Sequence, residues 1–186
     1  MIFQAIDFIK TILIGAAINA DLGNIGEIVS TSGSGHGGVS PLIISLVNIE
    51  ENRISRDPNN YIRDRTGVSI LRKNPAIHLN LTLLFTSVRH DGGYELALND
   101  VQSVIRVFQN KCVFDNSTEP RVPAGIDTLI LELLSLNLEQ LHQLWSMLGG
   151  KYHPSVAYKM RMVTIDSISD DQGSLITHIE ANYQLK

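Results

Sequence analysis

Residues 77–86 alternate in character almost without interruption, which is the pattern of a β-strand with one face on a core. One set is Ile77, Leu79, Leu81, Leu83 and Phe85, and the mainly polar set between them is His78, Asn80, Thr82, Leu84 and Thr86. Successive side chains of a strand point to opposite faces, so this period of two places the first set on the core and leaves the other face mainly polar. The chain must therefore build a sheet, for which other segments supply further strands and a cover.

Three segments have helical periodicity instead. Near the N-terminus the stripe is Ile2, Phe3, Ile6, Ile9, Ile12, Leu13 and Ala16. Over 94–110 it is Tyr94, Ala97, Leu98, Val101, Val104, Ile105 and Phe108. A third, short helix begins at Asn137, where Gln140 completes a capping box, and ends at Gly149 or Gly150. Its predicted buried stripe is Leu138, Leu141, Leu144, Trp145 and Leu148, which makes Trp145 a core anchor rather than a ligand platform.

Four further strands are predicted, over 39–49, 126–134, 156–163 and 175–185. The last two form a hairpin with its turn near Asp170–Gly173, which requires antiparallel pairing. We therefore predict an α+β fold over residues 1–186: a single domain with a mixed, mostly antiparallel sheet of about five strands packed by three helices. Residues 53–74 are polar and without a sustained period, so they are expected to form a long loop.

Composition favours an ordinary globular chain and points to no charged partner. The 186 residues carry a net charge of −4, which gives no general attraction to nucleic acid or to acidic membranes. Cys112 is the only cysteine, so an internal disulfide and a cysteine-based zinc site are both excluded. The N-terminal apolar stretch lacks a basic leader and is interrupted by Gln4, Asp7 and Lys10, so a docked helix is expected there, in a protein made in the cytoplasm.

No motif in the chain indicates catalysis or cofactor binding. The stretch Gly33–Gly38 lacks the Gly-Lys-Ser/Thr ending of a phosphate loop and precedes a strand, so it is interpreted as a linker. No two histidines have the i, i+4 spacing of a helical metal site, and Ser34 lacks the spacing of a nucleophile elbow. We assign no catalytic residue, metal ligand or cofactor, and expect that the protein is not an enzyme.

A basic cluster marks the predicted loop: Arg53, Arg56, Arg63, Arg65, Arg72 and Lys73. Acidic residues dilute it, and Tyr61 is its only aromatic side chain. A reader of single-stranded nucleic acid would need uninterrupted positive charge and several stacking side chains. A solvated loop or a protein-contact loop is therefore favoured over nucleic-acid binding.

The segment Leu133–Ser167 resembles the tail-terminator, or cap, proteins of extracellular contractile injection systems of the antifeeding-prophage type. The matching features are the pair Leu144-Trp145, then Tyr152, Ser155 and Tyr158, then Val163, Ile165 and Asp166. The stretches SLVNIEENRISRDP and NPAIHLNLTLLFT agree in order, and the helix at 94–110 lies where the family has one. The end of the first strand departs from the family, which often has aromatic residues where this chain has Ile49-Glu50-Glu51.

The resemblance implies a structural role without chemistry. Family members form a ring of six copies at the end of an inner tube and its contractile sheath, where they stop polymerisation and link the sheath to the tube. The implied partners are further copies of the chain, the tube protein and the sheath protein, with no nucleic acid and no membrane insertion. After synthesis in the cytoplasm the protein would become part of a phage-tail-like particle.

Two segments are candidate protein contacts under this hypothesis. The alternating last strand could pair with a strand of a neighbour, and the loop at 53–74 could become ordered at an interface. The candidate interface residues are Arg53, Arg56, Arg63, Arg65, His178, Glu180 and Tyr183. An adaptor domain without tail association is the second hypothesis. An enzyme with a site assembled around His78 or His178 is the third.

Overall fold

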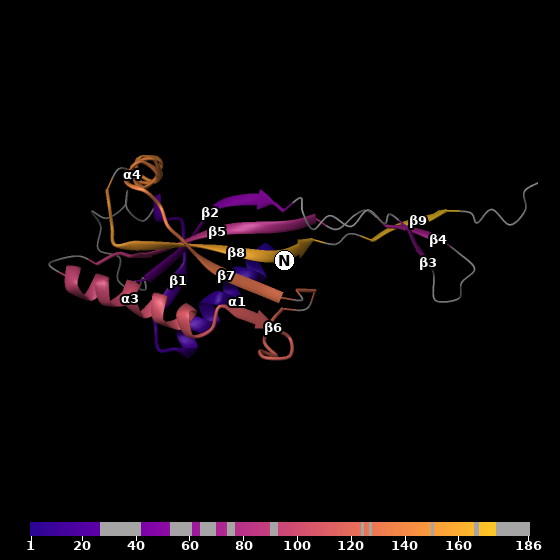
Figure 1. Ribbon diagram of the computed structural model, residues 1–186, viewed down its shortest axis with the longest axis horizontal. Coiled ribbons are helices and arrows are strands. Elements are labelled where there is room, and N and C mark those ends of the chain that lie inside the picture. The colour runs from indigo at the N-terminus through magenta and orange to yellow at the C-terminus, as the bar shows by residue number, and fades with distance from the viewer. Residues whose placement is uncertain are drawn as a thin grey trace, which may run out of the picture.

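The structure is a computed structural model in which a mixed sheet is covered by helices on both faces (Figure 1). Its three helices are α1 (Ile2–Gly15), α3 (Tyr94–Asn110) and α4 (Leu138–Met147). All three agree closely with the helices predicted from periodicity. The residues that the structure describes are 1–26, 42–52, 61–63, 70–73, 77–89, 93–123, 125–126, 128–149, 151–165 and 168–173.

The main sheet has six strands in the order β1-β2-β5-β8-β7-β6. These strands are β1 (Ala20–Leu22), β2 (Leu42–Glu51), β5 (Ile77–Ser87), β8 (Ser155–Ile165), β7 (Thr128–Leu134) and β6 (Val113–Asp115). The pair β1–β2 is parallel and the other four pairs are antiparallel. The α+β class and the mixed, mostly antiparallel sheet are thus confirmed, with one strand more than expected in this sheet.

In the long central strand β5 the predicted alternation is confirmed from Leu79 to Phe85, whereas Ile77, which it placed on the core, is 47% exposed, and Thr86 of the polar set is buried. Leu79, Leu81, Leu83 and Phe85 are buried in the main core, on the face covered by α1 and α3. Leu84 points to the opposite face and packs in a second, smaller core with Trp145. Figure 1 shows the corresponding layers, with α1 and α3 on one side of the sheet and α4 on the other.

The helix α1 contacts both edge strands of the main sheet. Its buried residues include Phe8, whose ring meets that of Phe114 in β6 edge-to-face at 5.6 Å between centroids. Its Lys10 forms an ion pair of 2.7 Å with Asp21 in β1. This hydrogen-bonded ion pair lowers the pKa of Asp21. The prediction of a docked amphipathic N-terminal helix is confirmed.

Two predicted helical stripes are broader than the buried faces. In α4 only Trp145 is buried, and Leu138, at the first helical position, is 85% exposed. In α3 the buried residues are Ala97, Val104 and Phe108, whereas Tyr94 and Leu98 at its start are exposed. The predicted burial of Leu138 is therefore wrong, and the stripe predicted for α3 is buried only in part, because periodicity marks a face of a helix but not how far a neighbouring element extends along it.

A second, three-stranded sheet lies apart from the first along the long axis of the molecule (Figure 1). It contains β3 (Tyr61–Arg63), β4 (Ile70–Lys73) and β9 (Ile168–Gly173), in the order β3-β4-β9. Two of these strands fall inside the range 53–74 that was expected to be a loop. The turn expected at Asp170–Gly173 is wrong, because those residues lie in β9, which pairs with β4.

Two other short strands, β1 and β6, have no counterpart in the prediction. Each has only three residues, which is too short for a period of two to be recognised. The strand predicted at 175–185 lies outside the described residues. Of the helices in the described part of the chain, none is long and apolar enough to cross a membrane.

Candidate assembly surface

The contact residues predicted from the sequence are largely outside the described residues. This holds for Arg53, Arg56, Arg65, His178, Glu180 and Tyr183. Arg63 is the last residue of β3, where it lies opposite Ile70 of β4. The surfaces described below are therefore those of the six-stranded sheet and its helices.

The segment that carries the family resemblance forms an aromatic cluster beneath α4. Trp145 is only 4% exposed and meets the ring of Tyr152 edge-to-face at 5.7 Å between centroids. The ring of His153 lies 5.9 Å from that of Trp145, measured between centroids, and Leu141 and Leu144 pack around the indole. The interpretation of Trp145 as a core anchor is confirmed. Its buried indole Nε1 has no hydrogen-bond acceptor among the residues that the structure describes.

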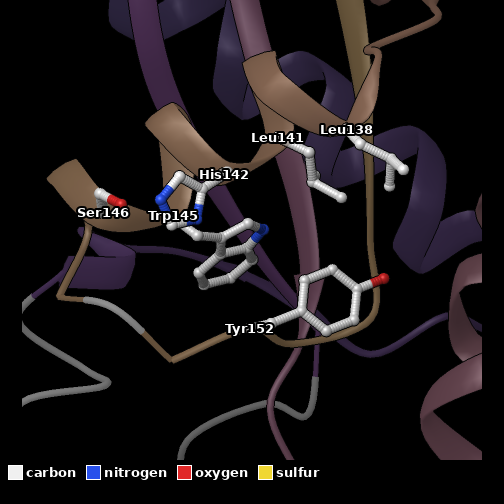
Figure 2. A pocket seen from close by; sticks show the side chains of 6 residues that line it. All are labelled: Leu138, Leu141, His142, Trp145, Ser146 and Tyr152. Carbon is white, nitrogen blue, oxygen red and sulfur yellow. The ribbon is translucent and has the colours of Figure 1, made fainter.

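A shallow pocket of about 210 Å³ opens beside this cluster (Figure 2). It is lined by Leu138, Leu141, His142, Trp145, Ser146 and Tyr152. Figure 2 shows the indole of Trp145 between the helix and the ring of Tyr152, with Leu138 and Leu141 nearer the start of the helix. The pocket lining is mostly apolar.

Two exposed apolar side chains line this pocket. They are Leu138, at the start of α4, and Tyr152, which follows the helix in the chain. Exposed apolar residues that lie together on a surface are typical of protein-contact regions. The sequence indicated the helix but not this exposure, because an exposed leucine and a buried one have the same spacing.

Beyond α4, the same face of the sheet becomes polar. Lys159 of β8 forms an ion pair of 2.5 Å with Glu50 of β2, across the intervening strand β5. Arg161 of β8 forms another, of 2.6 Å, with Glu132 of β7. Exposed ion pairs of this kind contribute little stability, on the order of 0–1 kcal/mol each. These four side chains neutralise one another, so the surface has no net charge that would attract nucleic acid.

A pocket of about 230 Å³ marks the boundary between this polar area and α4. Its lining includes Asn48 and Glu50 from β2, Thr82 from β5, and Gln140 and Leu144 from α4. A wider groove of about 380 Å³ lies on the other face, between α3 and β7, with Phe108, Leu133 and Tyr158 in its wall. Burial raises the pKa of Tyr158 above its ordinary value.

A polar group joined by three hydrogen bonds lies at the end of β5. Arg89 donates to both carboxylate oxygens of Asp100 in α3, at 2.7 and 2.9 Å, and Ser87 donates to the same carboxylate at 2.7 Å. The bonds to Asp100 raise the pKa of Arg89. These hydrogen bonds join the first half of α3 to the end of β5. Across the described residues, no three His, Cys, Asp or Glu side chains come together as a metal site would require.

A family model described as the Pvc16 N-terminal domain matches residues 7–178. No curated protein matches the sequence significantly. The matched range includes both sheets and all three helices except the first turn and a half of α1. It also includes the Trp145 cluster and all the predicted contact residues except Glu180 and Tyr183.

Among solved structures, the chain is similar to the sheath/tube terminator of PVC, an extracellular contractile injection system, in its extended state. The TM-score is 0.67 at 14% identity, and the match covers 100% of this chain and 64% of the terminator chain. A second similarity is to the tube-terminating cap of the anti-feeding prophage, with a TM-score of 0.49, 13% identity and coverage of 76% and 48%. The chain thus spans 64% of the length of the PVC terminator.

Proposed function

This chain belongs to the Pvc16 N-terminal domain family, and from that membership we propose that it is a terminator subunit of a contractile injection system. It would bind the last ring of the inner tube and of the sheath. It would then end their polymerisation and link the sheath to the tube at the distal end. The family match over residues 7–178 is the observation that carries the proposal. The fold shared over the whole chain with a sheath/tube terminator supports it.

The mechanism is geometric and needs no reaction. One surface of the subunit would match the growing end of the tube and sheath, and the opposite surface would offer no site for the next ring. We propose that six copies form this cap by head-to-tail contacts, because a ring closes when one patch of each subunit binds a different patch of the next. The exposed apolar residues around α4 are suited to such a contact.

Two finer contacts belong to the same proposal. The arginines Arg53, Arg56, Arg63 and Arg65 would contact the neighbouring subunit or the sheath. Residues His178, Glu180 and Tyr183 would lie on a strand that pairs with a neighbour. The subunit would be made in the cytoplasm and then join the particle.

Electron microscopy of tail particles from cells with and without this gene tests the function. We expect the deletion to give tubes that are over-long, uncapped or unstable, and the intact gene supplied in trans to restore particles of normal length. Particles of unchanged length with an intact distal end would contradict the proposal. In that case the adaptor hypothesis would replace it.

The arginine contact has its own test in the same assay. A gene carrying Arg63→Glu and Arg65→Glu should fail to restore capped particles, because the charge reversal turns attraction at the interface into repulsion. The matched control is Arg106→Glu, on the exposed surface of α3, which should restore them. If the double variant caps particles as well as the control, the arginines do not contact a partner.

A further inference from the structure

We propose that Asn48 closes the outer edge of β2 against strand addition by a second copy of the chain. An edge strand carries unpaired backbone N–H and C=O groups, and these can template pairing with another chain. The proposal concerns the six-stranded sheet itself and does not depend on the proposed terminator role.

Among the described residues, the outer edge of β2 is covered only at its beginning. Strand β1 pairs with Leu42, Ile43 and Ile44, and the N–H of Gly23 then donates to the carbonyl of Ile44 at 3.1 Å. After this point the chain turns away, held by the hydroxyl of Ser45, which donates to the carbonyl of Gly23 at 2.6 Å. In the described part of the chain, no strand pairs with the outer edge of β2 beyond Ile44.

The register shows which backbone groups this edge presents. The N–H of Asn52 donates to the carbonyl of His78 at 2.7 Å, so these two residues form a hydrogen-bonded pair of the antiparallel ladder. Hydrogen-bonded and non-hydrogen-bonded pairs alternate along such a ladder. The pair Ile49–Leu81 is therefore non-hydrogen-bonded. Hence the N–H and C=O of Ile49 point away from β5, toward the open edge.

The side chains at this edge would favour association. Ile49 is 48% exposed and Leu46 is 39% exposed. Both lie opposite leucines of β5 that face the main core, at Leu81 and Leu83. An exposed edge with β-branched and aliphatic side chains is a typical site of unwanted strand pairing. Something in the chain must occupy its backbone groups if the edge is to stay free.

Asn48 occupies the outward N–H of Ile49. Its side-chain Oδ1 accepts a hydrogen bond from that N–H at 2.9 Å. Its Nδ2 donates to Oε1 of Glu50 at 3.1 Å, and Oε2 of Glu50 is bound by Lys159 at 2.5 Å. The amide is therefore held in place by a carboxylate that is itself anchored to a strand two positions away in the sheet.

A backbone irregularity at the same place adds to the effect. The register between β2 and β5 shifts between Leu46 and Asn48, so Val47 is an extra residue on the edge strand. Such bulges bend the strand and increase its twist, which makes a poor template for a straight incoming strand. To add to this edge, a second copy would have to displace the Asn48 side chain and follow the bulge. Asn48, rather than the exposed charges of Glu50, thus acts directly on the backbone donor.

The test compares self-association of the full chain with and without the side-chain acceptor of Asn48. We expect Asn48→Ala and Asn48→Val to raise the weight-average mass, measured by light scattering after gel filtration, roughly twofold over the parent at equal concentration, because two freed edges can pair. Hydrogen exchange should show faster exchange of the Ile49 amide at low concentration. It should show slower exchange once the variant associates.

Two further variants make the result specific. Thr82→Val is the matched control, because Thr82 lies opposite Asn48 in the register but on a central strand, and it should leave the mass unchanged. Adding Ile49→Pro to Asn48→Val removes the freed N–H and should return the mass to that of the parent. The proposal is overturned if the folded Asn48 variants keep the parent mass. It is also overturned if Thr82→Val associates to the same extent, or if Ile49→Pro has no effect on association.

Discussion

At the scale of single residues, the hydrogen bonds of one carboxylate dominate the turn between β6 and β7. Asp115 accepts hydrogen bonds from the hydroxyl of Ser117 at 2.6 Å, from the N–H of Thr118 at 2.7 Å and from the N–H of Ser117 at 3.0 Å. These donors lower the pKa of Asp115 from 3.8 to about 2, and the hydroxyl of Ser117 makes the largest contribution. Such Asx turns stabilise the reversal of the chain that lets β6 pair with β7.

This shift predicts how the contribution of Asp115 to stability depends on pH. The pKa in the folded state lies below that in the unfolded state, so the stabilisation is fully present above about pH 4 and is lost as the pH falls toward 2. We expect Asp115→Ala to lower the thermal midpoint at pH 7. The difference in thermal midpoint between parent and variant, the gap, should narrow between pH 4 and pH 2. The measurement is thermal unfolding by circular dichroism across this range. A gap that is constant with pH would show that the ionised carboxylate is not what stabilises the turn.

At the scale of elements, α4 depends on its capping box because little of it is buried. Oδ1 of Asn137 accepts a hydrogen bond from the N–H of Gln140 at 2.7 Å, and Oε1 of Gln140 accepts one from the N–H of Asn137 at 3.0 Å. The predicted box is thus confirmed in both directions. A ten-residue helix is marginal on its own, so its cap and the buried Trp145, with Leu141 and Leu144 packed around it, hold it on the sheet.

We therefore expect Asn137→Ala to lower the free energy of unfolding by about 1 kcal/mol, since it removes the acceptor of the Gln140 N–H. Urea titration followed by the fluorescence of Trp145, the only tryptophan, measures this. Gln143→Ala on the exposed side of the same helix is the control and should change stability by less than about 0.5 kcal/mol. Equal effects of the two substitutions would mean that the cap adds nothing beyond helix propensity.

At the scale of the whole molecule, one sheet joins two cores that lie on its opposite faces. The larger core contains Phe8 of α1 and the buried side chains of β5, and the smaller contains Trp145 and Leu84. Because Leu83 and Leu84 are neighbours on the same strand but belong to different cores, loss of the sheet must expose both. We infer that the six-stranded sheet with its helices unfolds in one cooperative step.

Phe8→Ala tests this coupling from the end of the chain farthest from α4. We expect a loss of about 3–5 kcal/mol, because the substitution leaves a cavity against Phe114. Phe3→Ala, at a position that is 68% exposed on the same helix, should be close to neutral. Phe8 lies in the other core from Trp145, yet the transitions seen by tryptophan fluorescence and by far-ultraviolet circular dichroism should shift together. A fluorescence transition that stays at its parent position would show that the two cores unfold independently.

The sequence by itself determined the elements that are long and strongly periodic. The helix at 94–110 and the capping box at Asn137 were predicted correctly, as was the strand that includes Leu79 and Phe85. In each case the signal is local: a period of 3.6 or 2, or a pair of side chains three residues apart, is enough to specify the backbone. The terminator family was also recognised from a local pattern, between Leu144 and Tyr158.

Only the tertiary structure decided where each element ends against its neighbours. It exposed Leu138, placed Asp170–Gly173 in a strand, and added two three-residue strands at the edges of the main sheet. It also brought Lys159 to Glu50, which are 109 residues apart, and so fixed the side chain of Asn48 over the open edge of β2. These features depend on which strands become neighbours, and that order is set by the packing of distant segments rather than by any period within one of them.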